Sequence, residues 1–247
     1  MKKILLILVF ISTLFANEIT ITSDDGFKLY AWLNKPISVK KSTPIIVFVH
    51  QFSSDHKTWS ELAKKFNVKG FATLNVDLRG HGESIYQNQK KNKIIVEHRM
   101  EYIKSALVTS DKNIAFDQIP ADLIAWIELI SEDGTLDMDQ LYLFGSSLGG
   151  VSILPLLSEY EVKGLVSISA GKSKKLTQDI DMALAMSMTK SLFIASKNDP
   201  LGAADNSIEY ANKSISGTSL IISDNGHGTV LLPKVEHYIF SFIDSIK

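Results

Sequence analysis

The sequence contains no cysteine among its 247 residues. A chain without cysteine forms no disulfide, offers no thiolate as a nucleophile, and carries no lipid on a cysteine. It also has no cluster of metal-ligand residues and no phosphate-binding glycine loop, so we expect no cofactor and no metal. The formal net charge is only −1, which gives no electrostatic reason to bind nucleic acid. Any chemistry must therefore come from hydroxyl, imidazole and carboxylate groups.

The composition is that of an ordinary globular chain. Hydrophobic residues make up 45% and charged residues 21%, and the chain contains no internal repeat and no low-complexity tract. This balance argues against a disordered protein and against a membrane protein with several spans. A chain of this length can bury one large core, so we expect a single domain.

The first 16 residues differ from the rest. Two lysines precede an apolar run over residues 4–15, and Ala16 ends the segment before the polar Asn17. This is the three-part pattern of a secretory signal peptide, and the run is shorter than the roughly 20 residues that span a bilayer. Its removal leaves 24 basic and 27 acidic residues, a net charge of −3. We expect an exported protein, periplasmic or secreted, with no stable membrane span after cleavage and with residues 17–247 as one domain.

Strand and helix patterns alternate along the rest of the chain. Residues 18–22 and 27–33 read as two antiparallel strands joined by a tight Asp-Gly turn. The predicted buried strands that follow cover residues 45–49, 71–76, 141–144, 164–170, 191–195 and 219–222, and the predicted helices lie near residues 59–66, 120–131, 151–157, 182–188, 203–211 and 235–246. This alternation predicts an α/β fold with a doubly wound, mostly parallel sheet flanked by helices.

Residues 85–117 show no clear apolar period. Two interpretations stay open for this segment: a flap near the functional site, or a solvated surface excursion.

The most informative stretch begins at Leu141, where four apolar residues precede Gly-Ser-Ser-Leu-Gly-Gly. A buried strand followed by small residues predicts a sharp turn into a helix. Residues 145–149 match G-x-S-x-G, a pattern in which the middle serine sits on a strained strand-to-helix turn with its hydroxyl exposed. Glycine is needed there because a Cβ would collide with neighbouring backbone. Ser147, rather than Ser146, is therefore the predicted nucleophile.

A serine nucleophile needs a base, and in this arrangement the order along the chain is Ser, then Asp or Glu, then His. Only His227 and His237 follow Ser147. His237 falls inside the predicted closing helix, whereas His227 lies in a loop directly after the last predicted strand. We predict that His227 is the general base.

The acid that orients this base should follow a strand end, because ligands gather at the carboxyl ends of parallel strands. Asp199 lies just after the strand over residues 191–195, although its place before Pro200 also suits an ordinary turn. Asp205 lies farther into the next helix, and Asp224 is too close to the histidine in sequence to support it from a neighbouring strand. We predict Asp199 as the third member of the triad.

The negative oxygen that forms during acyl transfer needs donors aimed at it, and removing one donor costs about 10²- to 10³-fold in rate. We expect these donors to be two backbone amides. One belongs to Leu148, at the start of the helix after the nucleophile, and the other to Phe52, in the loop after the first central strand. His50 and His81 precede the elbow, and we assign both to loop structure.

Five segments together resemble the α/β-hydrolase superfamily, and they are distributed over nearly all of residues 20–247. They are residues 50–52 (His-Gln-Phe) with Trp59, 77–84 (Asp-Leu-Arg-Gly-His-Gly-Glu-Ser), 145–150 (Gly-Ser-Ser-Leu-Gly-Gly), 198–200 (Asn-Asp-Pro) and 226–229 (Gly-His-Gly-Thr). Within the superfamily the chain is most similar to compact dienelactone-hydrolase-like proteins. Those enzymes use cysteine where this chain has Ser147, so the resemblance does not extend to dienelactone as substrate. Gln51 also replaces a glycine common after the loop histidine, without removing the amide of Phe52.

The resemblance also indicates where a lid would be inserted, namely after the strand that follows the elbow helix. Only about twenty residues, 171–190, separate that strand from the next, so a large lid has no room. An open site suits small esters, or acyl groups presented on bulkier molecules.

The resulting prediction is an exported serine hydrolase that cleaves carboxylic esters of small-molecule or acyl substrates through an acyl-enzyme. One alternative is a serine peptidase or aminopeptidase on the same scaffold. The other is a binding protein that retains the fold without catalysis, since one fold hosts many functions.

Overall fold

The computed structural model describes residues 17–38 and 42–247. The predicted signal segment, residues 1–16, lies outside the described residues. Within the described part, no helix combines the length and the apolar character needed to cross a membrane.

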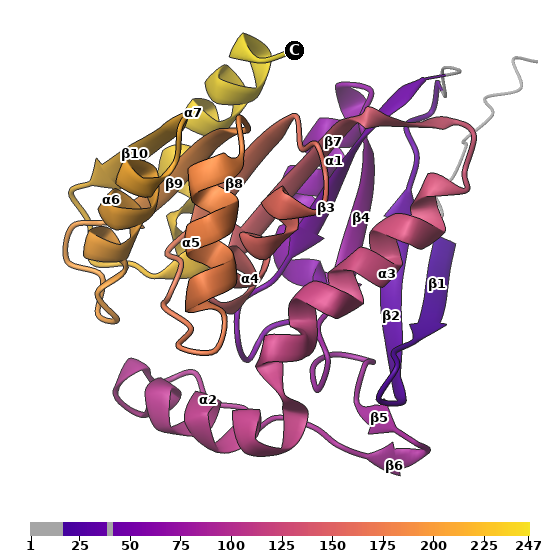
Figure 1. The fold of residues 1–247 in the computed structure, drawn as a ribbon, viewed down its shortest axis with the longest axis vertical. Helices are drawn as coiled ribbons and strands as arrows, with labels where there is room; N and C mark the ends of the chain where they lie inside the picture. Colours follow the sequence, from indigo (N-terminus) through magenta and orange to yellow (C-terminus); the bar gives the residue numbers. More distant parts are fainter. Residues whose placement is uncertain (1–16, 39–41) are drawn as a thin grey trace, which may run out of the picture.

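The strands of the described residues form one sheet (Figure 1). They are β1 (Asn17–Thr22), β2 (Phe27–Asn34), β3 (Thr43–Val49), β4 (Ala72–Asp77), β5 (Tyr86–Gln87), β6 (Lys90–Lys91), β7 (Leu136–Ser146), β8 (Gly164–Ile168), β9 (Lys190–Ser196) and β10 (Gly217–Ile222). Their order across the sheet is β10-β9-β8-β7-β3-β4-β2-β5-β6, and β1 pairs with β2. The pairs from β10 to β4 are parallel, whereas β2 is antiparallel to both β4 and β1.

The helices of the described residues lie on both faces of this sheet. They are α1 (Ser60–Val68), α2 (Met100–Ile114), α3 (Ile119–Ser131), α4 (Leu148–Ser152), α5 (Thr177–Met186), α6 (Ala203–Lys213) and α7 (Leu232–Ser245), with short 3-10 turns η1 (His56–Trp59), η2 (Phe116–Gln118), η3 (Pro155–Ser158) and η4 (Gly228–Leu231). In Figure 1, α3 and α5 lie in front of the sheet, and α1 and α7 lie behind it. The predicted α/β class with a mostly parallel sheet and flanking helices is confirmed.

Two apolar clusters account for these layers. Behind the sheet, α1 and α7 pack on one face of β3 and β7. Phe66 of α1 and Ile239 of α7 belong to the same buried apolar cluster as Phe48 of β3. In front, α3 buries Trp126 and α5 buries Leu184 in a second cluster that includes the opposite faces of the same strands. A strand covered on both faces has to be apolar along its whole length, which is why residues 45–49 read as a continuous hydrophobic run.

The topology has a switch point at the carboxyl end of β3. From β3 the chain crosses to β4, on one side, whereas from its neighbour β7 the chain continues to β8, on the other side. Ligand sites of doubly wound sheets lie where the outgoing connections of adjacent strands diverge in this way. The loops that follow β3 and β7 are therefore the first place to look for a site.

The helix after β7 is short, as its proline predicts. The α4 helix ends at Ser152, and Pro155 begins a separate 3-10 turn. Proline lacks the amide proton that would continue the helical hydrogen bonds, so it limits the element to just over one turn.

Candidate functional site

Ser147 occupies a strained turn between β7 and α4. Its backbone has φ 48° and ψ −110°, a left-handed φ that a residue with a side chain rarely adopts. The turn is held because the Ser147 amide donates to the carbonyl of Ile168 at 2.8 Å. A Cβ placed on Gly149 would lie 2.4 Å from the carbonyl oxygen of Val49, so a larger residue at 149 would push the turn away from β3. The predicted elbow geometry is present.

The side chains of Ser147, His227 and Asp199 meet at this turn. The Oγ of Ser147 lies 2.8 Å from Nε2 of His227. On the other side of the ring, Nδ1 lies 3.0 Å from Oδ1 and 2.9 Å from Oδ2 of Asp199. Because Nδ1 faces two carboxylate oxygens, it carries the proton and donates, which leaves Nε2 as the acceptor for the serine hydroxyl. The structure therefore brings together the three residues that the sequence singled out.

Burial makes these contacts stronger than they would be in water. The exposed fractions of Ser147, His227 and Asp199 are 9%, 6% and 8%. Burial of Asp199 raises the pKa of its carboxyl, but the hydrogen bond and charge of His227, with the amide of Leu201 donating to Oδ1 at 2.9 Å, outweigh that effect and hold the pKa below its usual value. The carboxyl is thus ionised at neutral pH and can stabilise a positive imidazole.

The two predicted oxyanion amides lie at the ends of neighbouring strands. Leu148 is the first residue of α4, and Phe52 follows β3 by three positions. Among the described residues, neither backbone amide donates to another protein group. An oxyanion site requires backbone amides that are free to donate, and the role of these two as donors stays a prediction.

The two histidines assigned to structure sit away from the triad contacts. Nε2 of His50 accepts from the amide of Leu78 at 3.1 Å, and Nδ1 lies 2.7 Å from the carbonyl of Gln51. Nδ1 of His81 lies 3.0 Å from the carbonyl of Arg79. Burial lowers the pKa of both rings, with that of His81 falling to about 3, so both are neutral at pH 7. Each ring shapes the loop that carries it.

Sequence reasoning missed the role of Asp77 in these loops. Its Oδ1 accepts from the amide of His56 at 2.7 Å and lies 2.9 Å from the ring Nδ1 of the same residue, while Oδ2 accepts from the amide of Glu83 at 2.8 Å. One buried carboxylate thus fixes both the loop after β3 and the loop after β4. The available signal was an acid at the end of an apolar strand, followed by glycines.

Sequence reasoning also gave Gln51 no contacts. Its side-chain oxygen accepts from Ser146 Oγ at 2.8 Å and from the amide of Thr229 at 2.9 Å. Ser146 and Thr229 lie 95 and 178 residues from Gln51 in the sequence. Contacts over such separations leave no local pattern, so the single sequence does not indicate these partners.

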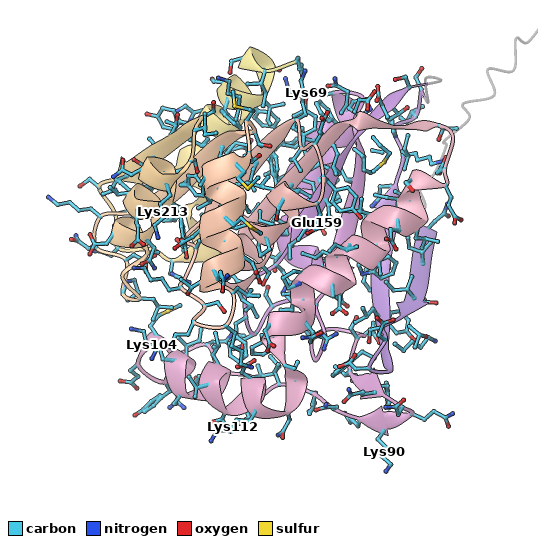
Figure 2. All side chains as sticks on the ribbon, in the orientation of Figure 1. Lys69, Lys90, Lys104, Lys112, Glu159 and Lys213 are labelled. Carbon is cyan, nitrogen blue, oxygen red and sulfur yellow. The ribbon has the colours of Figure 1, made fainter. Side chains whose placement is uncertain are left out.

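The segment over residues 85–117 contains the strands β5 and β6 and the helix α2. Figure 1 shows α2 beside the edge at which the parallel strands end, and in Figure 2 Lys112 points away from the body of the protein. The amide of Glu97, just before α2, donates to Ser53 at 2.9 Å. The segment therefore contacts the loop after β3, and both interpretations of it, a flap near the site and a solvated surface excursion, stay open.

Lys175, in the loop after β8, forms ion pairs with the other end of this segment. Its Nζ lies 3.2 Å from a carboxylate oxygen of Asp111 and 2.6 Å from one of Asp117. The segment between β8 and β9, where a large lid was excluded, holds only α5, which buries Ile180 and Leu184 against the sheet.

No group of three or more His, Asp or Glu side chains in the described part of the chain is arranged to hold a metal ion. The row of contacts from Ser147 through His227 to Asp199 is the arrangement that nucleophilic catalysis by a serine requires.

A family model described as acetyl xylan esterase (AXE1) matches residues 10–162. The match includes the elbow and the predicted nucleophile, and it ends before Asp199 and His227. No curated protein matches the chain.

Solved structures with a similar fold cover nearly the whole chain. The α/β hydrolase GrgF from Penicillium sp. sh18 has a TM-score of 0.69 at 15% identity, covering 94% of this chain and 99% of its own. A dienelactone hydrolase from Anabaena variabilis has a TM-score of 0.63 at 17% identity, with 94% and 96% covered. Est1E from Butyrivibrio proteoclasticus, a structure with ferulic acid bound, has a TM-score of 0.66 at 16% identity, with 92% and 99% covered. The predicted resemblance to α/β hydrolases, including dienelactone-hydrolase-like proteins, is confirmed.

Proposed function

Because the chain belongs to the acetyl xylan esterase family, whose model matches more than half of it, we propose that it is an exported serine esterase that releases short acyl groups from larger molecules. Family membership makes it a carboxylic-ester hydrolase. The acyl-enzyme mechanism, the substrate and the export are the parts proposed here. The observation that carries the mechanism is the row of contacts from Ser147 through His227 to Asp199, at 2.8 Å and 2.9 Å.

In the first half of the reaction, the Oγ of Ser147 attacks the ester carbonyl while Nε2 of His227 takes the hydroxyl proton. The carbonyl oxygen becomes negative and is stabilised by the amides of Phe52 and Leu148. The ionised Asp199 holds the ring in the tautomer that accepts this proton and stabilises the positive imidazolium. The imidazolium then gives the proton to the departing alcohol, and the acyl group stays on the serine.

In the second half, water enters in place of the alcohol. Nε2 of His227 takes a proton from this water as its oxygen attacks the acyl carbonyl, and the same two amides stabilise the negative oxygen. Collapse breaks the bond to Ser147, the serine regains its proton from His227, and the free acid leaves. Each proton moves over a hydrogen bond of the kind already present between Ser147 and His227.

Two observations support a short acyl group on a bulky alcohol. The family is described by its action on acetylated xylan, in which acetate is attached to a polysaccharide. The segment between β8 and β9 adds no enclosing lid, because α5 packs on the sheet. A site without a deep acyl tunnel can hold acetate while leaving room for a polymer outside.

Export is supported by the charge and length pattern of residues 1–16. Expression with this segment should place a shorter protein, beginning near Asn17, outside the cytoplasm. N-terminal sequencing of the released protein checks this part independently of activity.

A panel of 4-nitrophenyl esters with acyl chains of increasing length tests the substrate class. We expect kcat/KM to be highest for acetate and to fall by at least about tenfold for octanoate, since a chain that cannot be enclosed gains little apolar burial. Release of acetate from acetylated xylan should accompany this preference. A maximum at long acyl chains, or cleavage of aminoacyl anilides faster than of acetate esters, would overturn the assignment.

A further inference from the structure

One side chain outside the triad joins the loops that carry it. The Oε1 atom of Gln51 accepts three hydrogen bonds: from Ser146 Oγ at 2.8 Å, from the amide of Thr229 at 2.9 Å, and from Thr229 Oγ1 at 3.2 Å. The partners come from the nucleophile elbow and from the loop after β10, while Gln51 itself belongs to the loop after β3.

The orientation of this amide follows from its partners. A backbone amide can only donate, so the atom of Gln51 that faces the amide of Thr229 must be the oxygen. A carbonyl oxygen has two lone pairs, which match the two shorter contacts, and the third contact at 3.2 Å shares one of them. The contact is therefore directional, and an apolar side chain cannot reproduce it.

Two residues in this contact are adjacent to residues of the proposed machinery, and the third lies two positions from one. Gln51 immediately precedes Phe52, Ser146 immediately precedes Ser147, and Thr229 follows the base by two positions. Because adjacent residues share a rigid peptide plane, fixing Gln51 and Ser146 restricts Phe52 and Ser147 directly. Thr229 restricts the base through the single residue Gly228. A single oxygen atom thus links the oxyanion amide, the nucleophile and the base.

The loop after β10 leaves space for this oxygen. Gly228 has φ +69°, and a Cβ added to it would lie 2.2 Å from Oε1 of Gln51. The absence of a side chain at 228 thus lets the amide reach its three partners.

The three loops also have anchors of their own. In the loop after β3, the amide of His56 donates to Oδ1 of Asp77 at 2.7 Å. At the elbow, the amide of Ser147 donates to the carbonyl of Ile168, and in the loop after β10, the carbonyl of Gly226 accepts from Ser196 Oγ at 2.6 Å. Loss of the Gln51 contact therefore leaves each loop attached to the sheet. What is lost is the link between the loops.

We propose that Gln51 is a positioning residue, which keeps the nucleophile, the base and the oxyanion amide at the separations that acyl transfer requires. The inference rests on the proposed function and goes beyond it, because it assigns the alignment of the site to a contact outside the triad. Misplacement of a reacting group by about 1 Å can cost about 10²-fold in rate, so a link of this kind has a large effect on kcat with little effect on stability.

The test compares Gln51→Met with Gln140→Met. Methionine matches glutamine in length but lacks the acceptor oxygen. Gln140 is the matched control because its Oε1 also accepts a hydroxyl bond, from Tyr142 at 3.2 Å, in the first half of β7 rather than at the elbow. For each variant, kcat and KM are measured with 4-nitrophenyl acetate, and the unfolding temperature is measured by circular dichroism.

We expect Gln51→Met to lower kcat by about 10²-fold while KM changes by less than about threefold, since the lost interaction aligns groups in the transition state rather than binding substrate. Gln140→Met should keep the wild-type kcat. In a Ser146→Ala background, the Gln51→Met substitution should cost less than in the wild type, because one of its contacts is already gone.

A Gln51→Met protein with wild-type kcat would overturn the proposal, as would a loss of activity that follows only the fraction unfolded. Equal costs in the wild-type and Ser146→Ala backgrounds would overturn it too. The outcome is separable from failure of the proposed function, in which the wild-type protein itself would not cleave the ester.

Discussion

The buried histidine at position 81 predicts a specific dependence of stability on pH. The ring of His81 is 2% exposed, and it contacts the rings of His50 at 5.0 Å and Phe52 at 5.5 Å between centroids. Its Nε2 has no hydrogen-bond partner among the described residues. A proton on this nitrogen would place a charge in an apolar setting without a partner, and this burial, with the charge of His50, lowers the pKa from 6.5 to about 3.

The sign of the effect follows from which state takes up the proton. Below pH 6.5 the unfolded chain binds a proton at this histidine, whereas the folded protein does not until about pH 3. The contribution of the neutral ring is therefore fully present above pH 6.5 and is lost progressively as the pH falls through this window. The difference between the pKa values of the unfolded and folded states corresponds to about 5 kcal/mol in the free energy of unfolding. Between about pH 7.5 and about pH 5, the free energy of unfolding falls by about 2 kcal/mol.

The test substitutes phenylalanine for His81, which keeps a ring next to Phe52 and removes the titrating group. Urea unfolding monitored by tryptophan fluorescence gives the free energy of unfolding at several pH values. Between about pH 7.5 and about pH 5, the wild type should lose about 2 kcal/mol more than the variant. His50 titrates in both proteins, so its effect largely cancels in the comparison. Parallel curves for the two proteins would refute the claim that a neutral buried ring is present.

The remaining predictions concern the triad, the elbow and a buried ion pair. Asp199→Asn should lower kcat by about 10⁴-fold with the fold retained, because an amide no longer favours the tautomer of His227 in which Nε2 accepts a proton. Steady-state kinetics measure kcat, and circular dichroism checks the fold. Gly149→Ala should lower both the unfolding temperature and the rate of labelling by a fluorophosphonate, since the added Cβ would lie 2.4 Å from the carbonyl oxygen of Val49. Gly171→Ala should change neither quantity, because a Cβ at position 171 has open space around it. Asp122→Leu should cost about 3–5 kcal/mol in urea unfolding, because it leaves the buried guanidinium of Arg79 without its 2.6 Å partner; a cost below about 1 kcal/mol would contradict this.

The sequence predicted the sheet well because burial on both faces makes central strands apolar throughout. Residues 45–49 and 164–170 stand out for this reason, and the structure has the buried strands β3 and β8 there, with β8 ending at Ile168. It also singled out Ser147, because the turn from β7 to α4 leaves no room for a Cβ at Gly145 or Gly149. His227 and Asp199 followed from chain order and from their places after strand ends. The structure brings the three side chains together, and their catalytic roles stay predictions.

The parts that the sequence did not predict depend on contacts between distant residues. The α2 helix buries Ser110 as well as Ile103 and Ile114, and its Tyr102 and Val108 are exposed, so its apolar pattern is blurred. Burial of a serine in this helix is explained by a partner outside it, since Ser110 Oγ accepts from the amide of Ile95 at 2.9 Å. The link made by Gln51 across the three loops is hidden for the same reason.

The measurement that tests the central claim most directly is the mass of the native protein after reaction with a fluorophosphonate, with the modified peptide identified by tandem mass spectrometry. The account predicts one adduct per chain, on Ser147, and none on a Ser147→Ala protein or after heat denaturation. An adduct on another residue, or ester hydrolysis that persists undiminished in Ser147→Ala, would contradict it.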